Sequence, residues 1–269
     1  MADTSSQYSL LLNDEEKLKL EDQNSRLVCD FKANKLEEDA KKYWDLFYKR
    51  NENRFFKDRH WTTREFQELL EEDVLSHNLK TLLEIGCGVG NFIFPLFEEN
   101  FNMFIYACDI SPRAVELVKS HPKYSEQALK VFQTDITTKD ILNEVPINSV
   151  DIATLIFVLS AIHPDKFILV LQHIYLLLRT GGILLFRDYG LYDMTQIRFK
   201  PGHKISENFY MRQDGTRSYF FSTEFLKELF LKSGFVILSC DYIHRRTVNK
   251  KEGIDCPRIF VQAKLQKPE

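Results

Sequence analysis

A glycine-rich loop between an apolar run and a helix constrains the fold most. The segment Glu84–Asn91 reads EIGCGVGN and follows an apolar run at 81–85 that is typical of a buried strand. Glycines adopt positive φ without strain and let the backbone approach a ligand, while the following helix offers free N–H groups. Strand, glycine loop and helix in this order predict the opening unit of a parallel α/β sheet.

The strand–helix alternation continues along the chain. Further strands are expected at 103–108, 129–133, 150–157 and 183–186. Helices are expected at 34–50, at 62–74, from about Asn91, after a Ser111 cap, at 164–179 with Gly181 and Gly182 ending it, and at 223–233. Two more strands, at 235–243 and 258–264, follow each other without a helix between them. We therefore predict a doubly wound α/β fold with a seven-stranded sheet, right-handed crossovers and a terminal antiparallel hairpin. An aromatic and basic insert, 189–221, follows strand five.

Composition supports a large globular domain. The chain has 269 residues, 44% of them hydrophobic, and a net charge of −3, which excludes a globally basic nucleic-acid binder. Its five cysteines are odd in number and widely spaced, so we expect neither a disulfide framework nor a metal site. Neither a signal peptide nor a membrane span is predicted, and we expect a cytoplasmic or nuclear protein. The expected domains are an acidic segment that is a mobile tail or a loosely docked helix (1–33), an N-terminal helical region (34–80) and the main domain (81–269).

Two acids behind the glycine loop indicate a nucleoside ligand. Asp109 ends the second strand, where a carboxylate can bind a ribose diol, and Asp135 ends the third strand beside Ile136. A dehydrogenase would also use Asp109, but position 91 is Asn where the dinucleotide motif needs glycine. The pattern E-x-G-x-G-x-G at 84–90 resembles the S-adenosylmethionine site of class I methyltransferases. This resemblance implies that Asp135 accepts from the adenine amino group and that Ile136 covers the ring. Ordinary turn acids beside a tight loop remain the alternative.

Longer stretches carry a closer resemblance. Residues 35–264 resemble the tRNA 3-methylcytidine methyltransferases, above all the short members linked with serine tRNAs, through WDLFYKRNENRFFKDRHW, LLEIGCGVGN, ACDISPRAVELVK, LIFVLSAIHPDK, LLFRDYGLYD and NFYMRQDGTRSYFF. The resemblance implies a Rossmann-like class I methyltransferase fold and methyl transfer from S-adenosyl-L-methionine to N3 of cytosine 32 in the tRNA anticodon loop. It also implies seryl-tRNA synthetase as a candidate partner. The cofactor residues that it and the glycine motif together indicate are Trp44, Tyr48, Gly86, Gly88, Asp109, Asp135, Ile136 and Ile156.

Basic and aromatic residues alternate in the segment 41–64, which holds eight basic and three acidic residues. Basic side chains hold phosphates and aromatic faces stack on unpaired bases, although a buried aromatic stripe with a solvated charged face would give the same pattern. The insert and the segment 245–251 add further basic residues. The candidate RNA-binding residues are Arg54, Lys57, Arg59, His60, Arg187, Arg212, Arg217, Arg245 and Arg246.

The expected chemistry needs little acid–base assistance. Cytosine N3 carries a lone pair, so methyl transfer depends on alignment and on stabilising the cationic product. We predict that Asp188, after strand five, accepts from the cytosine amino group and that Tyr189 positions the base; the alternative is that Asp188 only braces Arg187 or a turn. From sequence alone, a small-molecule or protein methyltransferase, a nicotinamide dehydrogenase and a non-catalytic RNA-binding module remain open.

Overall fold

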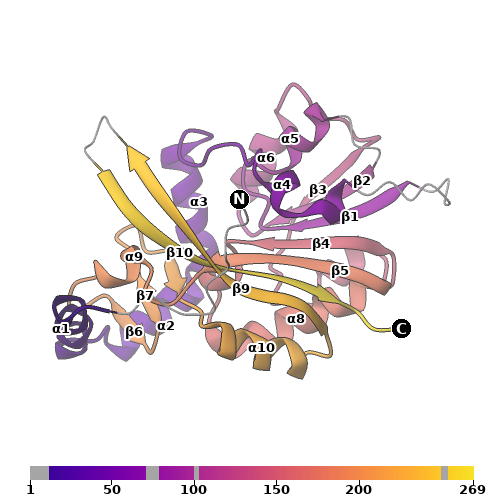
Figure 1. Ribbon diagram of the computed structural model, residues 1–269. Helices are drawn as coiled ribbons and strands as arrows, with labels where there is room; N and C mark the ends of the chain where they lie inside the picture. Colours follow the sequence, from indigo (N-terminus) through magenta and orange to yellow (C-terminus); the bar gives the residue numbers. More distant parts are fainter. Residues whose placement is uncertain (1–11, 71–78, 100–102, 250–253) are drawn as a thin grey trace. The chain divides into compact units, whose positions relative to one another are not determined.

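The computed structural model describes residues 12–70, 79–99, 103–249 and 254–269. Seven strands form one sheet in the order β3-β2-β1-β4-β5-β10-β9, and β9 and β10 are neighbours as the predicted terminal hairpin requires (Figure 1). This confirms the predicted fold class. The strands are β1 (Lys80–Ile85), β2 (Met103–Asp109), β3 (Leu129–Gln133), β4 (Val150–Ile156), β5 (Leu178–Tyr189), β9 (Val236–Asn249) and β10 (Ile254–Gln266).

The central strands are parallel and in register. Ile85 pairs with Cys108 across β1 and β2, and β1 pairs with β4 on its other side. The last four residues of β1 are buried, and all but Glu84 are apolar, because helices cover both faces of a parallel sheet. The carboxyl ends of β1, β2 and β3 therefore meet at one edge, and the order reverses at β1, where ligands of such sheets bind.

The chain divides into two compact units. Unit 1 contains residues 1–40, 156–168 and 186–265, and unit 2 contains residues 41–155, 169–185 and 266–269. These limits differ from the predicted boundaries at 33/34 and 80/81, because both units draw on distant parts of the chain.

The helices lie close to their predicted places, with shifted bounds. The predicted helix 34–50 is interrupted at Asp39. Of the predicted helix 62–74, one short α-helix and one 3-10 turn are described, and Val74 lies outside the described residues. The helices are α1 (Asp14–Asp22), α2 (Asp30–Glu38), α3 (Ala40–Asn51), α4 (Thr62–Glu65), α5 (Ile93–Glu98), α6 (Pro112–Lys119), α7 (Ile141–Glu144), α8 (Phe167–Leu177), α9 (Met194–Ile197) and α10 (Thr223–Lys232).

The N-terminal segment, over its described part, fits the expected docked helix rather than a mobile tail. Asn13 and Glu16 form a capping box at the start of α1. Gln23 is fully buried; its amide donates to the carbonyls of Gln196 and Phe199, and its own oxygen accepts from the Tyr210 hydroxyl. A buried amide with three partners anchors a segment that composition alone marks as solvated.

The insert is also folded. It contains α9 and a small sheet of β6 (Lys204–Ser206), β7 (Phe209–Met211) and β8 (Arg217–Tyr219). Before it, Gly181 and Gly182 lie inside β5, whereas the sequence suggested that they end the preceding helix, which stops at Leu177. A side chain at Gly182 would come 2.8 Å from the Arg179 carbonyl and 3.0 Å from that of Val150, which explains the glycine. Among the described helices, none is long and apolar enough to cross a bilayer.

Candidate functional site

The glycine loop of unit 2 has the predicted left-handed backbone. Gly86, Gly88 and Gly90 all have positive φ, at 68°, 54° and 88°. A Cβ atom added at Gly88 would lie 2.9 Å from the Tyr48 hydroxyl, so the loop has no room for a side chain there. The loop thus exposes backbone rather than side chains, as close approach to a ligand requires.

Asp109 holds this loop from the end of β2. Its two carboxylate oxygens accept from the N–H groups of Gly88 and Ser111, each at 2.9 Å. Burial raises the pKa of Asp109 to about 6, although these N–H groups favour the charged form. The predicted Ser111 cap is confirmed, since its hydroxyl accepts from Ala114 N. A carboxylate has about four acceptor positions, so Asp109 keeps capacity for a ribose diol.

Glu84, the first residue of the motif, is buried at the end of β1. One carboxyl oxygen, Oε2, has no hydrogen-bond partner among the described residues. Burial raises the pKa of Glu84 to about 8, while the positive charge of Arg59 opposes the shift. A buried acceptor without a donor fits a cationic ligand such as the ammonium group of a bound amino acid.

Aromatic side chains of α3 pack on the loop. Phe47 and Tyr48 are buried in a cluster with Val89 and Ala114, and Trp44 is partly buried against it. The Trp44 and Tyr48 rings are 6.1 Å apart. The structure therefore brings both aromatic residues predicted to close over the cofactor to the glycine loop.

Two polar side chains that the sequence analysis did not assign hold these elements together. The Asp45 carboxylate accepts from the Ser111 hydroxyl at 2.8 Å and from Arg113 N at 3.2 Å, which fixes α3 to the start of α6. The Asn91 amide donates to Asp58 Oδ1 at 3.0 Å. Asn91, which stands where a dinucleotide motif has glycine, therefore anchors the segment before α4. Its departure from that motif was the one indication of this role in the sequence.

The remaining predicted cofactor residues are divided between the units. Asp135 is half-buried in unit 2 and its Oδ1 accepts from Thr137 N at 2.8 Å, as a turn-forming acid would. Ile136 beside it is buried, and its carbonyl lies 2.9 Å from His173 Nδ1. Ile156 is buried at the end of β4 and belongs to unit 1. Within the described residues, no group of three or more His, Cys, Asp or Glu side chains could hold a metal ion.

In unit 1, Asp188 is fully buried at the end of β5. Its oxygens accept from the N–H groups of Ser160 and Tyr189, each at 2.9 Å. Burial raises the pKa of Asp188 to about 6, opposed by these N–H groups and by Arg212. Asp188 therefore braces the turn at Ser160, which was one of the two predicted roles. Its other predicted role, as an acceptor for the cytosine amino group, stays a prediction.

Tyr189 belongs to an aromatic cluster of unit 1. Its ring centre lies 5.1 Å from that of Phe157 and 6.2 Å from that of Phe260, and the Arg212 guanidinium lies 5.3 Å from it. Phe157 has a positive φ of 59°, an uncommon conformation for an aromatic residue that is concentrated at functional sites. Phe157 could not be predicted as a site residue, because no residue pattern in a single sequence indicates backbone strain.

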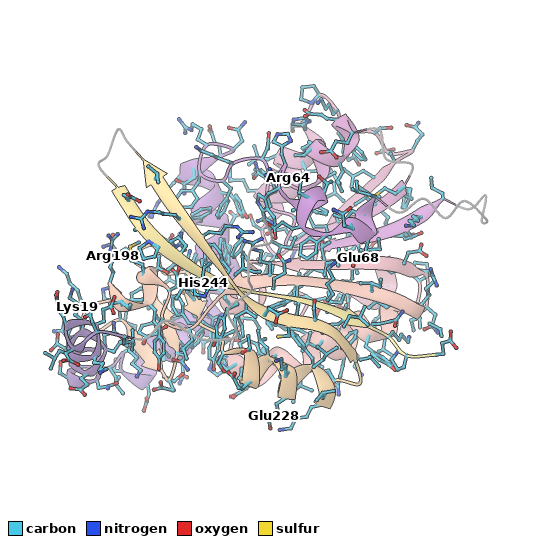
Figure 2. All side chains as sticks on the ribbon, viewed as in Figure 1. Lys19, Arg64, Glu68, Arg198, Glu228 and His244 are labelled. Atoms are coloured by element: carbon cyan, nitrogen blue, oxygen red, sulfur yellow. The ribbon has the colours of Figure 1, made fainter. Side chains whose placement is uncertain are left out.

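The candidate RNA-binding residues differ in their exposure to solvent. Arg54, Lys57 and His60 are exposed and Arg59 is half-buried in unit 2; in unit 1, Arg245 and Arg246 are exposed and follow His244, which Figure 2 labels. Arg212 is half-buried, and Arg246 forms an ion pair with Asp255.

Two of the candidate RNA-binding arginines are buried and form hydrogen bonds within the protein. Arg187 is buried and donates to Gln262, and Arg217 is buried with partners Glu37 and the Ala161 carbonyl. Their guanidinium groups are therefore turned from solvent, which contradicts the predicted phosphate contacts.

Comparisons with known proteins show the family of the chain. The family model described as "Methyltransferase domain" matches residues 56–240. The human tRNA N(3)-cytidine methyltransferase METTL6 is 57% identical over 259 residues, covering 96% of this chain and 90% of the relative. The tRNA(Thr) (cytosine(32)-N(3))-methyltransferase of Saccharomyces cerevisiae is 40% identical over 93% of this chain and 41% of the yeast protein.

A solved structure supports the fold. The 1,6-didemethyltoxoflavin-N1-methyltransferase of Burkholderia thailandensis, solved with S-adenosylhomocysteine bound, has a TM-score of 0.57 at 15% identity and covers 87% of this chain and 90% of its own. The family itself is established by the sequence relatives and the family model. The chain belongs to the S-adenosylmethionine-dependent tRNA N(3)-cytidine methyltransferases.

Proposed function

We propose that this protein methylates N3 of cytidine 32 in the anticodon loop of serine tRNAs. The single observation that carries the methyl-donor half is the buried arrangement of Glu84, Gly88 and Asp109 around the glycine loop. The substrate half is supported by the relatives, one of which is named for cytosine 32. The choice of serine tRNAs is supported by the resemblance of the motifs to the short family members.

Different residues of unit 2 bind different parts of the cofactor. Asp109 accepts from the ribose hydroxyls, Asp135 accepts from the adenine amino group and Ile136 covers the ring. Glu84 Oε2 accepts from the ammonium group. This assignment is supported by the fact that the oxygen has no other hydrogen-bond partner in the part of the chain that the structure describes. The left-handed Gly86 and Gly88 let the backbone approach the methionine part.

Trp44 and Tyr48 complete the proposed cofactor site with apolar surface. Both pack beside the glycine loop in unit 2, whereas Ile156 belongs to unit 1 and stays a predicted cofactor contact. S-adenosylmethionine supplies an electrophilic sulfonium methyl group. Apolar walls exclude water from that group and prevent its loss to solvent.

The residues of unit 1 position the base. Bound S-adenosylmethionine would supply its methyl group to the lone pair of cytosine N3 and would leave as the neutral thioether, so no residue would have to remove a proton first. Tyr189 stacks on the flipped base. Asp188 holds the N–H of Tyr189 and supplies negative charge that stabilises the cationic product; above its pKa of about 6 it is ionised for this role.

The exposed basic residues hold the tRNA backbone. Arg54, Lys57 and His60 of unit 2 and Arg245 and Arg246 of unit 1 are the proposed phosphate contacts. We further propose that seryl-tRNA synthetase presents the substrate and that the protein works in the cytoplasm, the nucleus or both. Imaging of a tagged protein beside compartment markers tests the location.

The function is tested by incubating the protein with total tRNA and methyl-labelled S-adenosylmethionine, with and without seryl-tRNA synthetase, and analysing the digested nucleosides by mass spectrometry. We expect labelled 3-methylcytidine in serine tRNAs, increased by the synthetase. The variant Asp109→Asn should lose the label together with cofactor binding. Stable tRNA binding without label would favour an RNA-binding module, and label in protein or small molecules would favour the other methyltransferase classes.

A further inference from the structure

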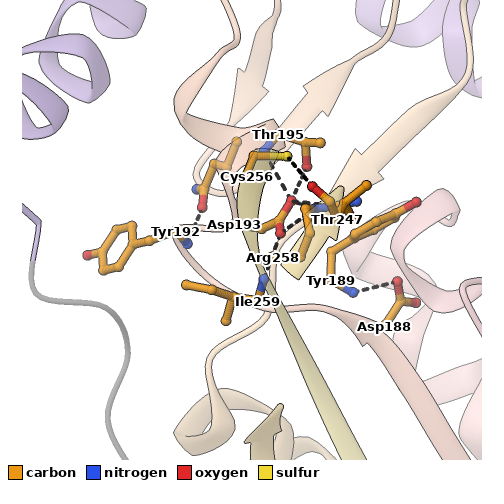
Figure 3. Close-up of polar contacts among 10 residues, drawn as sticks. Asp188, Tyr189, Tyr192, Asp193, Thr195, Thr247, Cys256, Arg258 and Ile259 are labelled. Carbon is orange, nitrogen blue, oxygen red and sulfur yellow. Dashed lines mark hydrogen bonds and ion pairs between the residues drawn. The ribbon is translucent and has the colours of Figure 1, made fainter. Parts of the chain in front are cut away.

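A buried ion pair joins the start of the insert to β10. Asp193 is fully buried, and its carboxylate lies 2.9 and 3.2 Å from Arg258 Nε and 3.1 Å from a terminal guanidinium nitrogen (Figure 3). The same carboxylate accepts from Ile259 N at 2.8 Å and from both the N–H and the hydroxyl of Thr195. Asp193 is thus satisfied by residues 65 or more positions away as well as by its own turn.

The backbone around the pair is tightly fitted. Gly190 N donates to the Ile259 carbonyl at 3.0 Å, and Asp193 N donates to the Gly190 carbonyl at 3.1 Å. A Cβ atom at Gly190 would lie 2.7 Å from Ile259 Cγ2 and 3.2 Å from the backbone of Phe260. The turn directly after Tyr189 is therefore locked against the strand that carries Phe260.

The arginine of the pair also faces both aromatic rings. The Arg258 guanidinium lies 6.0 Å from the centre of the Tyr189 ring and 5.1 Å from that of Phe260. Both rings are only half-buried, so each keeps surface for a ligand. A planar guanidinium can bond a carboxylate in its plane and contact rings with its faces, which an ammonium group cannot do.

Buried ion pairs seldom add stability over well-packed apolar residues, because desolvation offsets the attraction. Their best-supported use is to fix one arrangement among several. We propose that Asp193 and Arg258 are positioning residues that hold Tyr189 and Phe260 at the orientation needed for the target pyrimidine. This rests on the proposed function, which places the base at Tyr189.

The first test separates rate from binding. In Arg258→Lys the charge stays but the planar contact is lost, and we expect the single-turnover methylation rate to fall about 100-fold, as misplacement of a reacting group does. The Kd for S-adenosylmethionine and the KM for tRNA should change less than about threefold. The matched control is Arg179→Lys, which alters the exposed ion pair with Asp151 in unit 2 and should keep the rate.

A second variant excludes misfolding as the cause. Asp193→Asn with Arg258→Met removes both charges, so no buried charge is left unpaired, and the amide oxygen can still accept from Ile259 N. The same loss of rate with an unchanged melting temperature supports the proposal. An undiminished rate in both variants, or a loss that follows the melting temperature and cofactor affinity, would overturn it.

A readout without substrate separates this proposal from the proposed function. With 4-fluorophenylalanine in place of Phe260, ¹⁹F NMR should give one sharp resonance in the otherwise unaltered protein and several or broadened resonances in Arg258→Lys. Identical spectra would refute positioning by Arg258, whatever the substrate is. Absence of 3-methylcytidine formation by the wild type, with the expected spectral change, would instead refute only the proposed function.

Discussion

The buried Glu84 predicts a pH-dependent stability that a single substitution removes. The pKa of this carboxyl is about 8 in the folded protein against 4.5 ordinarily, because burial disfavours its charge. The folded state therefore binds a proton more tightly than the unfolded state. The resulting stabilisation is complete below pH 4.5 and is lost as the pH rises to about 8. The pKa values of Asp109 and Asp188 are about 6, so most of their titration lies below the interval from pH 6.5 to 8.5, where Glu84 titrates.

The magnitude follows from the length of this interval. At about 1.4 kcal/mol per pKa unit, the unfolding free energy of the wild type should fall about 2 kcal/mol more than that of Glu84→Gln between pH 6.5 and 8.5. Urea denaturation of the ligand-free proteins at constant ionic strength measures the difference. Glu98→Gln is the control, since Lys123 holds the pKa of exposed Glu98 below its usual range. Parallel pH profiles for wild type and Glu84→Gln would refute the reasoning.

Three further predictions concern ligand and rate. Gly88→Ala forces a side chain into a left-handed backbone against Tyr48, at a cost of about 1–2 kcal/mol, and should weaken S-adenosylmethionine binding about tenfold in calorimetry; a change under twofold would contradict the loop geometry. At saturating cofactor, the single-turnover rate should fall as the pH drops through about 6, and Asp188→Asn should lower the rate and remove this dependence; a full rate in that variant would disprove the role. Reversing charge at Arg54 and Lys57 should weaken tRNA binding and lower its salt slope by about two, whereas an unaltered slope would exclude both as phosphate contacts.

Local pattern was sufficient to predict the sheet and the glycine loop. The strands of unit 2 are short apolar runs, and the positive φ at Gly86 and Gly88 follows from a motif of neighbouring residues. The Ser111 cap is likewise a local arrangement. Such features depend on a few adjacent residues, which is why one sequence was enough to place them.

Features that depend on residues far apart in the chain could not be predicted from the sequence. Arg217 was predicted to bind RNA, but its partner Glu37 lies 180 residues away, and nothing near Arg217 in the chain indicates burial. Gln23 stands in an acidic, polar segment, yet its partner Tyr210 lies in the insert. A basic or polar side chain looks the same in a sequence whether it faces solvent or a buried acceptor, so only the fold separates the two.

The proposed function depends on where the methyl donor binds. The most direct test is a crystal structure of the protein with S-adenosylhomocysteine. We expect its ribose hydroxyls at Asp109, its adenine beside Asp135 and Ile136, and its ammonium group at Glu84 Oε2. Electron density for the ligand away from the glycine loop, or a loop closed by Tyr48 with no ligand under saturating conditions, would contradict the account.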